Sequence, residues 1–306
     1  MNELSALLAS SIDSGTPLAI AALGLLLNER AGIINLGAEG LMLVAAVAGF
    51  ATAVVTRNQA LALLAGAAAA AVLSASFGAL VIWLNTNQYA SGLALSLFGA
   101  GLSAFVGIPY TQESLATQAA PGVPELARLP FVGQVLFSHH ALVYFAVALA
   151  LGQGWFFFRS KAGLVVRAVG ESPEAAQALG YRVRWIRLAA VVSGGALVGL
   201  AGAYVSVVST PLWVEGMIAG KGWIALSLTT FATWRPARVL LGAYLFGGVT
   251  MLQLHLQARG VSAPVELLTS LPYLATILVL VLISQNPRWI AANMPHSLGK
   301  PFYPGA

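Results

Sequence analysis

The sequence contains no cysteine and very few charged residues. Of its 306 residues only 8% are Asp, Glu, Lys or Arg, whereas 58% are hydrophobic and the mean hydropathy is +0.84. A soluble domain carries about 25% charged residues, so too few charges are present to cover a water-exposed surface. The absence of cysteine excludes disulfides and thiolate metal sites. These shortages indicate an integral membrane protein whose surface is covered largely by the lipid bilayer.

One long stretch, from Asn58 to Gln112, has no charged residue. A membrane helix needs about 20 apolar residues, so this stretch alone holds two. The apolar runs are continuous rather than alternating, which favours helices over a β-barrel. We predict an all-α polytopic bundle that forms a single transmembrane domain over residues 1–306. The nine predicted spans lie at about 7–28, 39–56, 60–84, 90–108, 140–158, 188–208, 219–233, 238–256 and 270–284.

Basic residues are concentrated in the predicted loop at about 159–187, which holds six of the fifteen. The positive-inside rule places this loop in the cytoplasm. Counting spans outward then puts eleven basic residues inside and three outside, with Lys221 left within a span. The N-terminus falls outside and the C-terminus inside. The net charge of +5 therefore reflects orientation, and we expect no nucleic-acid partner.

A short sequence echo links two predicted spans. Ala94-Leu-Ser-Leu97 recurs as Ala225-Leu-Ser-Leu228. The predicted topology runs these two spans in opposite directions. This arrangement suits the inverted repeats that build many transporters.

The cytoplasmic loop contains a short segment with the signals of one capped helix. Ser172 can act as the N-cap, Pro173 suits the first helical position, and Glu174 lies near the positive end of the helix dipole. Gly180 can adopt the left-handed conformation that ends a helix. Between these signals, Ala175, Ala176 and Ala178 predict a smooth face. The segment is either an ordinary connector or a knob that docks into a groove of a soluble partner.

Three motifs resemble those of ABC importer permeases of the sugar, branched-chain amino acid and nucleoside group. The first, in the cytoplasmic loop, resembles the coupling helix that contacts the ATPase. The second, at residues 28–40, is most similar to the nucleoside branch. The third is Asn87-Gln88 followed by Ser91-Gly-Leu-Ala-Leu95. The coupling-helix positions that carry the resemblance or lie within it are Arg167, Gly170, Glu171, Ser172, Pro173, Glu174, Ala175, Ala176 and Gly180.

The resemblance implies the membrane-spanning permease subunit of an ATP-driven importer in the bacterial cytoplasmic (inner) membrane. Its implied partners are ABC ATPase subunits, a second permease that is identical or related, and an extracytoplasmic substrate-binding protein. The implied cargo is a nucleoside or related polar solute, with a simple sugar as the alternative. The chain has no Gly-x-x-x-x-Gly-Lys-Ser/Thr phosphate loop, so we expect ATP on the partner subunit and no cofactor on this chain.

Two polar clusters are candidates for the substrate pathway. Asn35 and Glu39 interrupt the apolar pattern between the first two spans, and Asn87, Gln88 and Ser91 precede the fourth. Polar groups that remain within lipid usually face a cavity or a partner. Amide and hydroxyl groups also match the hydroxyls and base edges of a nucleoside. The alternatives are an inner loop for the first cluster and a plain cytoplasmic turn for the second.

Two other functional classes fit the sequence less well. An ion-coupled transporter tends to bury several charged residues within its spans, and these spans are nearly free of them. A membrane enzyme needs a nucleophile, a metal or an acid–base cluster, and no such grouping is evident. The sequence therefore favours a transport subunit whose chemistry is supplied by a partner.

Overall fold

The structure is a computed structural model that describes residues 3–116, 132–260 and 293–303, with isolated residues between 264 and 281. In these residues the regular elements are helical, apart from one isolated β-bridge between Ser114 and Leu212. Seven of the described helices are long and apolar enough to cross a membrane. The prediction of an all-α, multi-pass membrane protein is therefore confirmed.

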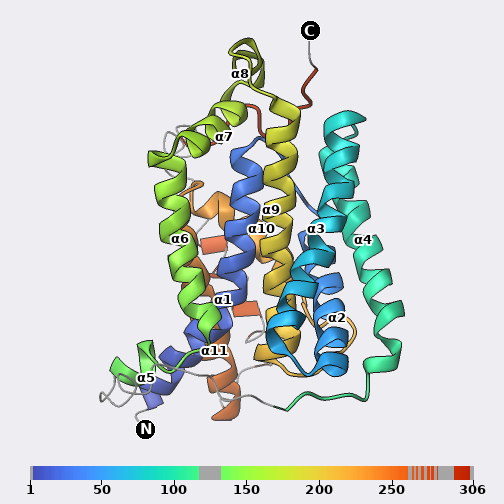
Figure 1. Cartoon of the computed structure of the whole chain (residues 1–306). Helices are drawn as coiled ribbons and strands as arrows, with labels where there is room; N and C mark the ends of the chain where they lie inside the picture. Colours follow the sequence, from blue (N-terminus) through green and yellow to red (C-terminus); the bar gives the residue numbers. More distant parts are fainter. Residues whose placement is uncertain are drawn as a thin grey trace.

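Long helices alternate with short connecting elements (Figure 1). The long helices are α1 (Glu3–Arg30), α2 (Ala38–Thr56), α3 (Gln59–Trp83), α4 (Gln88–Gly107), α6 (Ala141–Arg159), α9 (Val183–Tyr204) and α11 (Pro236–Ala258). The short elements are η1 (Ile108–Tyr110), α5 (Val132–Leu136), α7 (Lys161–Glu171), α8 (Pro173–Ala178), the π-helical turn η3 (Val205–Ser209) and α10 (Lys221–Phe231).

Helix α1 forms the centre of the bundle, with α6 and α9 on either side in Figure 1. It also packs against α10 and α11. Its residues from Leu18 to Leu26 are all buried. A helix that is apolar on every side is stable only when neighbours cover it all round. The apolar composition of α1 therefore accounts for its central position.

Glycine allows two of these helices to approach at backbone distance. Where α2 crosses α4, a Cβ atom added at Gly99 would lie 2.5 Å from the Cα atom of Gly40. Such contacts between small residues let membrane helices associate through close van der Waals packing. This crossing fixes the position of α4 beside the start of α2.

The predicted span at 219–233 is wrong. Helix α10 has 11 residues, which is about 16 Å of helix against the roughly 30 Å of a bilayer core. It starts inside the bundle, where the two carboxyl oxygens of Glu39 accept hydrogen bonds from the N–H groups of Gly220 and Gly222, each at 2.8 Å. Glu39 thus satisfies backbone donors that lipid could not. The predicted span at 270–284 falls largely outside the described residues.

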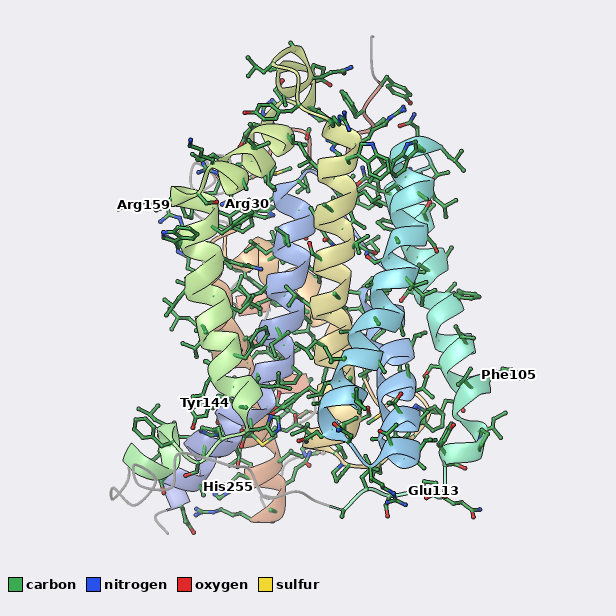
Figure 2. The ribbon with its side chains drawn as sticks, viewed as in Figure 1. Arg30, Phe105, Glu113, Tyr144, Arg159 and His255 are labelled. Atoms are coloured by element: carbon green, nitrogen blue, oxygen red, sulfur yellow. The ribbon has the colours of Figure 1, made fainter. Side chains whose placement is uncertain are left out.

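The bundle has two distinct ends (Figure 1). The N-terminus and α5 lie at one end, called here the N-terminal end. Helices α7 and α8 and the C-terminus lie at the other, called here the α8 end. In Figure 2, Arg30 and Arg159 lie toward the α8 end, whereas Glu113 and His255 lie toward the N-terminal end.

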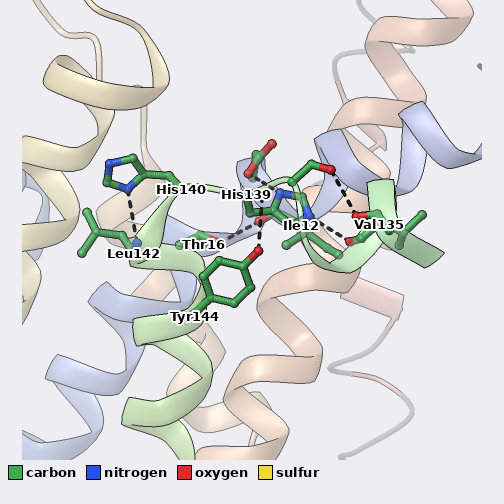
Figure 3. A network of polar contacts seen from close by, with 10 residues as sticks. Ile12, Thr16, Val135, His139, His140, Leu142 and Tyr144 are labelled. Atoms are coloured by element: carbon green, nitrogen blue, oxygen red, sulfur yellow. Dashed lines mark hydrogen bonds and ion pairs between the residues drawn. The ribbon is translucent and has the colours of Figure 1, made fainter. Parts of the chain in front are cut away.

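A buried histidine holds the N-terminal end together (Figure 3). His139 is only 1% exposed, and its Nδ1 lies 2.8 Å from a carboxyl oxygen of Asp13 in α1. Its Nε2 lies 2.8 Å from the carbonyl oxygen of Val135 in α5. Burial lowers the pKa of His139, but the hydrogen bonds to Asp13 and Val135 and the charge of Asp13 outweigh it, and the net pKa is raised. The raised pKa favours an imidazolium that donates through both nitrogens.

Candidate coupling site and buried polar segment

Helix α8 has the caps that its sequence predicts. The Ser172 side chain accepts a hydrogen bond from the N–H of Ala175 at 3.2 Å, and Pro173 occupies the first helical position. Gly180 ends the turn with a φ of +87°. The predicted short helix is therefore confirmed, and it projects from the α8 end of the bundle (Figure 1).

The three alanines of α8 do not share one face, so that prediction is wrong for Ala176. Ala175 and Ala178 are exposed, whereas Ala176 is buried together with Val169, Val183 and Phe302. Helical spacing places residues 173 and 176 on the same side, toward the bundle. The free face instead includes Leu179, which is 78% exposed. Sequence reasoning missed Leu179, although an apolar residue directly before the terminal Gly180 was the available signal.

The other positions of the coupling motif anchor α7. The guanidinium of Arg167 stacks 4.9 Å from the ring centre of Phe158. Gly170 packs against the carbonyl oxygen of Arg30, leaving no room for a side chain. The carboxyl group of Glu171 accepts a hydrogen bond from the N–H of His296 at 3.3 Å. These contacts hold α7 against α6, the end of α1 and His296 near the carboxyl terminus. Glu174 stays exposed on α8.

Two adjacent ionisable residues at the end of α1 are buried in the protein. Glu29 is 4% exposed and Arg30 is 3% exposed. The indole Nε1 of Trp234 donates a 2.5 Å hydrogen bond to Glu29, and the hydroxyl of Thr229 lies 2.9 Å from both carboxyl oxygens. Arg30 donates to the backbone carbonyl of Trp234 at 2.6 and 3.2 Å. The pair therefore fastens α1 to the turn between α10 and α11.

The two polar clusters predicted separately from the sequence meet in space. The side-chain oxygen of Gln88, at the start of α4, accepts a hydrogen bond from the N–H of Ile34 at 2.8 Å. Asn35 is fully buried, and its side-chain oxygen accepts from the N–H of Gly37 at 2.9 Å. Residues 31–37, called here the buried segment, thus form irregular backbone between α1 and α2 that side-chain amides satisfy.

Asn87 and Ser91 make local contacts. Asn87 is the N-cap of α4 and accepts from the N–H groups of Tyr89 and Ala90. The hydroxyl of Ser91 lies 2.9 Å from that of Thr86. Asn87 is exposed and Ser91 is half-buried. The prediction that both residues line a pathway stays a prediction.

Several buried amide groups near the buried segment keep unused hydrogen-bonding capacity. Within the described residues, the amide nitrogens of Asn35 and Gln88 have no partner. Both polar atoms of the fully buried Asn28 also lack one. An unpaired buried polar group is costly, so these positions favour ordered water or a second conformation that supplies partners.

One large groove in the described structure does not suit a polar solute. A groove of about 740 Å³ lies between α1, α6, α7 and α9. Its lining is apolar except for Gln153 and Ser193, and Ser193 bonds to carbonyl groups of its own helix. Among the described residues, no group of three or more His, Asp or Glu side chains could hold a metal ion. The described residues therefore provide a short projecting helix, α8, and a buried polar segment as candidate functional features.

Comparison with known proteins decides the family. A model of the family described as "branched-chain amino acid transport system / permease component" matches residues 7–283. The chain belongs to this permease family. The resemblance in the sequence motifs is thereby confirmed, and the permease is the transport subunit of an ABC-type importer rather than an enzyme. This family implies a transport system with an ATPase and a substrate-binding partner.

Three curated relatives align with nearly all of the permease. It is 41% identical to a putative glucose ABC transporter permease protein of Haloferax volcanii, over 92% of both chains. It is 31% identical to a nucleoside ABC transporter permease protein of Lactococcus lactis, over 92% of this chain and 93% of the relative. It is 30% identical to a guanosine ABC transporter permease protein of Bacillus subtilis, over 97% and 98%. No solved structure matches the permease.

Proposed function

We propose that the permease carries a nucleoside, or a related solute with a sugar ring, through the bacterial cytoplasmic membrane. Two relatives are named for nucleoside or guanosine transport and a third for glucose transport. These solutes share a hydroxylated ring, which amide and hydroxyl side chains recognise by matched donors and acceptors. A nucleoside is the principal proposal, and a simple sugar is the alternative that the uptake experiment separates from it.

The assembly that we propose pairs this chain with a second permease, two ATPase subunits and an external binding protein. ATP binds on the ATPase subunits, and the permease domain itself carries no cofactor. We place the α8 end in the cytoplasm, so that the N-terminus lies outside and the C-terminus inside. Charge supports this orientation. The described basic residues toward the α8 end are Arg30, Arg159, Lys161, Arg167, Arg182, Arg184, Arg187, Arg235, Arg238 and Lys300, whereas Arg57 and Arg259 lie at the N-terminal end.

The observation that carries the mechanism is the two-sided packing of α8. Its inner face, Pro173 and Ala176, is buried, while Ala175, Ala178 and Leu179 project from the bundle. A six-residue helix is too short to be stable alone in water, and its contacts with α7 and α9 hold it in place. An apolar projection on a rigid base suits a groove on an ATPase subunit. In this proposal, closure of the ATPase pair moves α7 and α8 together.

The pathway proposal places the buried segment and the start of α4 beside the solute. Asn35 and Gln88 bond the irregular backbone of the buried segment, and Glu39 bonds the start of α10. Asn87 and Ser91 lie where α4 begins. The unpaired amide nitrogens of Asn35 and Gln88 are available to a solute or to water if the segment moves. In this proposal the seven described spans, the predicted span at 270–284 and the shorter helix α10 surround this path and include inverted repeats. Helices α4 and α10 support the repeats, because the start of α4 contacts Ile34 of the buried segment and the end of α10 contacts Glu29 at the adjoining end of α1.

Uptake into proteoliposomes tests the proposed function directly. The permease would be reconstituted with its ATPase and binding-protein partners and supplied with labelled nucleosides or sugars. We expect nucleoside uptake that needs ATP and stops when the ATPase carries an inactivating substitution. Sugar uptake under the same control would replace the nucleoside with the alternative. Uptake that continues with the inactive ATPase would contradict an ATP-driven mechanism.

A further inference from the structure

The carboxyl-terminal segment at residues 293–303 crosses the α8 end and connects elements that are distant in the sequence (Figure 1). Ser297 is its central residue and is 6% exposed. Its N–H donates to the carbonyl oxygen of Gly170 in α7 at 3.0 Å, and its hydroxyl lies 2.7 Å from the same oxygen. Two residues later, the N–H of Gly299 donates to the carbonyl oxygen of Gly32 at 3.2 Å. The segment therefore bonds α7 on one side and the buried segment on the other.

A buried arginine completes this connection from α9. Arg187 is 2% exposed, and its Nε donates to the carbonyl oxygen of Ala31 at 3.1 Å. A terminal nitrogen of the same guanidinium donates to the hydroxyl of Ser297 at 3.0 Å. The guanidinium also lies 5.7 Å from the ring centre of Phe302, within range of a cation–π contact. One planar group thus joins the first residue of the buried segment to the carboxyl-terminal segment.

Arg187, Ser297 and Gly299, called here the node, are tightly packed against their neighbours. A Cβ atom added at Gly32 would lie 2.6 Å from the hydroxyl oxygen of Ser297 and 2.9 Å from a guanidinium nitrogen of Arg187. A Cβ atom added at Gly299 would lie 2.9 Å from the hydroxyl oxygen of Tyr89, one residue into α4. Close-packed groups transmit small displacements instead of absorbing them. The node therefore touches α7, the buried segment and the start of α4 together.

The node differs from the direct contact between α7 and α1. Gly170 also packs against the carbonyl oxygen of Arg30 without a hydrogen bond to it. A van der Waals contact of this kind resists compression, so it can push but not pull. The hydrogen bonds through Ser297 and Arg187 resist separation as well. Movement of α7 in either direction is thereby carried to the backbone at residues 31 and 32.

We propose that Arg187 and Ser297 are positioning residues that transmit movement of α7 and α8 to the buried segment through the carboxyl-terminal segment. The proposal rests on the proposed docking of α8 with an ATPase subunit. Neither residue needs to touch the solute or the ATPase. Their role is to make the buried segment move together with α7 and α8. Each ATP hydrolysed is then accompanied by movement of the buried segment.

Coupling efficiency is the first test. The complete transporter in proteoliposomes would carry Ser297→Ala or Arg187→Gln. Ser193→Ala is the matched control, because among the described residues the Ser193 hydroxyl bonds to carbonyl groups of its own helix, α9. We expect solute uptake per ATP hydrolysed to fall about 5-fold or more in the first two variants, while ATP hydrolysis and subunit assembly persist. The double variant should match the more impaired single variant, because both substitutions break one connection. Uptake per ATP equal to the control would overturn the proposal.

A labelling experiment separates lost transmission from lost stability. The chain has no native cysteine, so Leu36→Cys reports on the buried segment and Ala178→Cys reports on α8. In the parent transporter we expect both thiol-labelling rates to differ between nucleotide-free and ATP-trapped states. With Ser297→Ala, the mildest substitution, the difference should persist at position 178 and disappear at position 36. A difference that survives at position 36 would refute the transmission role, whereas no difference at position 178 in the parent would refute the docking of α8 itself.

Discussion

Trp234 donates a 2.5 Å hydrogen bond to Glu29, although the two residues are 205 positions apart in the chain. The bond joins the end of the central helix α1 to the turn between α10 and α11. Thr233 and Trp234 hold that turn with φ values of 47° and 53°, which are uncommon for residues other than glycine. Glu29 and Arg30, which lie in the second motif, therefore stabilise the packing of α1 against the turn between α10 and α11.

Trp234→Phe should destabilise the permease because it leaves a buried carboxyl group short of one partner. Leaving a buried acceptor without its partner costs about 1–3 kcal/mol, and we expect a loss of that size. The measurement is the thermal unfolding midpoint of the purified permease in detergent. Trp223→Phe, at a 38% exposed position in α10, is the control. Equal midpoints for the two variants would contradict this stabilising contact.

Gly99→Val should separate α2 from α4. The new side chain would overlap the backbone of Gly40, which cannot move aside as a flexible side chain would. Overpacking of this kind costs about 1–3 kcal/mol, and thermal unfolding would report it. Gly101→Val is a close control, because among the described residues no atom beyond its own stretch of helix lies within 4 Å of a Cβ built at that position. An unfolding midpoint as low for Gly101→Val as for Gly99→Val would show that the crossing is not the cause.

Two alanines of α8 should respond in opposite ways to glutamate. Ala178→Glu places a charge on the exposed face, so uptake should fall about tenfold if a docking surface is lost, with stability changed by less than about 0.5 kcal/mol. Ala176→Glu places the charge among Val169, Val183 and Phe302, so the folded protein itself should be destabilised. Uptake and unfolding measured on both variants would separate the two effects. Normal uptake by Ala178→Glu would argue against docking.

The stabilisation provided by His139 should depend on pH. Its folded pKa is raised above the usual 6.5, so its contribution is complete below about pH 6.5 and is lost as pH rises through the folded pKa. The stability difference between the parent and His139→Gln should therefore be larger at pH 5.5 than at pH 8. Thermal unfolding at both pH values would measure it, and a difference independent of pH would contradict the pair with Asp13.

The neighbouring His140 provides a control of opposite sign. Burial lowers the pKa of His140, and the charge of Asp13 only partly offsets this effect. Its contribution should therefore be present above the unfolded pKa and fall as the pH drops through the folded pKa. Its Nδ1 accepts a hydrogen bond from the N–H of Leu142 at 3.2 Å, which requires an unprotonated nitrogen. His140→Gln should consequently cost more at pH 8 than at pH 5.5.

Features controlled by neighbouring residues could be predicted from the sequence. The caps of α8 at Ser172 and Gly180 depend on interactions within one turn, and they match the structure. The span predicted at 219–233 failed because hydropathy records composition and not depth. What places the start of α10 inside the bundle is the Glu39 carboxyl group, 181 residues from the first N–H group that it accepts.

The membrane class, the long helices and the permease family could be inferred from the sequence, because apolar run length, capping and motif spacing are properties of short stretches of chain. The structure was needed to show that Ala176 faces inward, that Gln88 meets the buried segment, and that Arg187 and Ser297 connect α7 to that segment. Each of these features includes a contact between residues that are far apart in the sequence, so their positions in the chain do not predict that they meet in space. Their partners were set by the packing of helices around α1, which brings distant backbone groups within hydrogen-bonding reach.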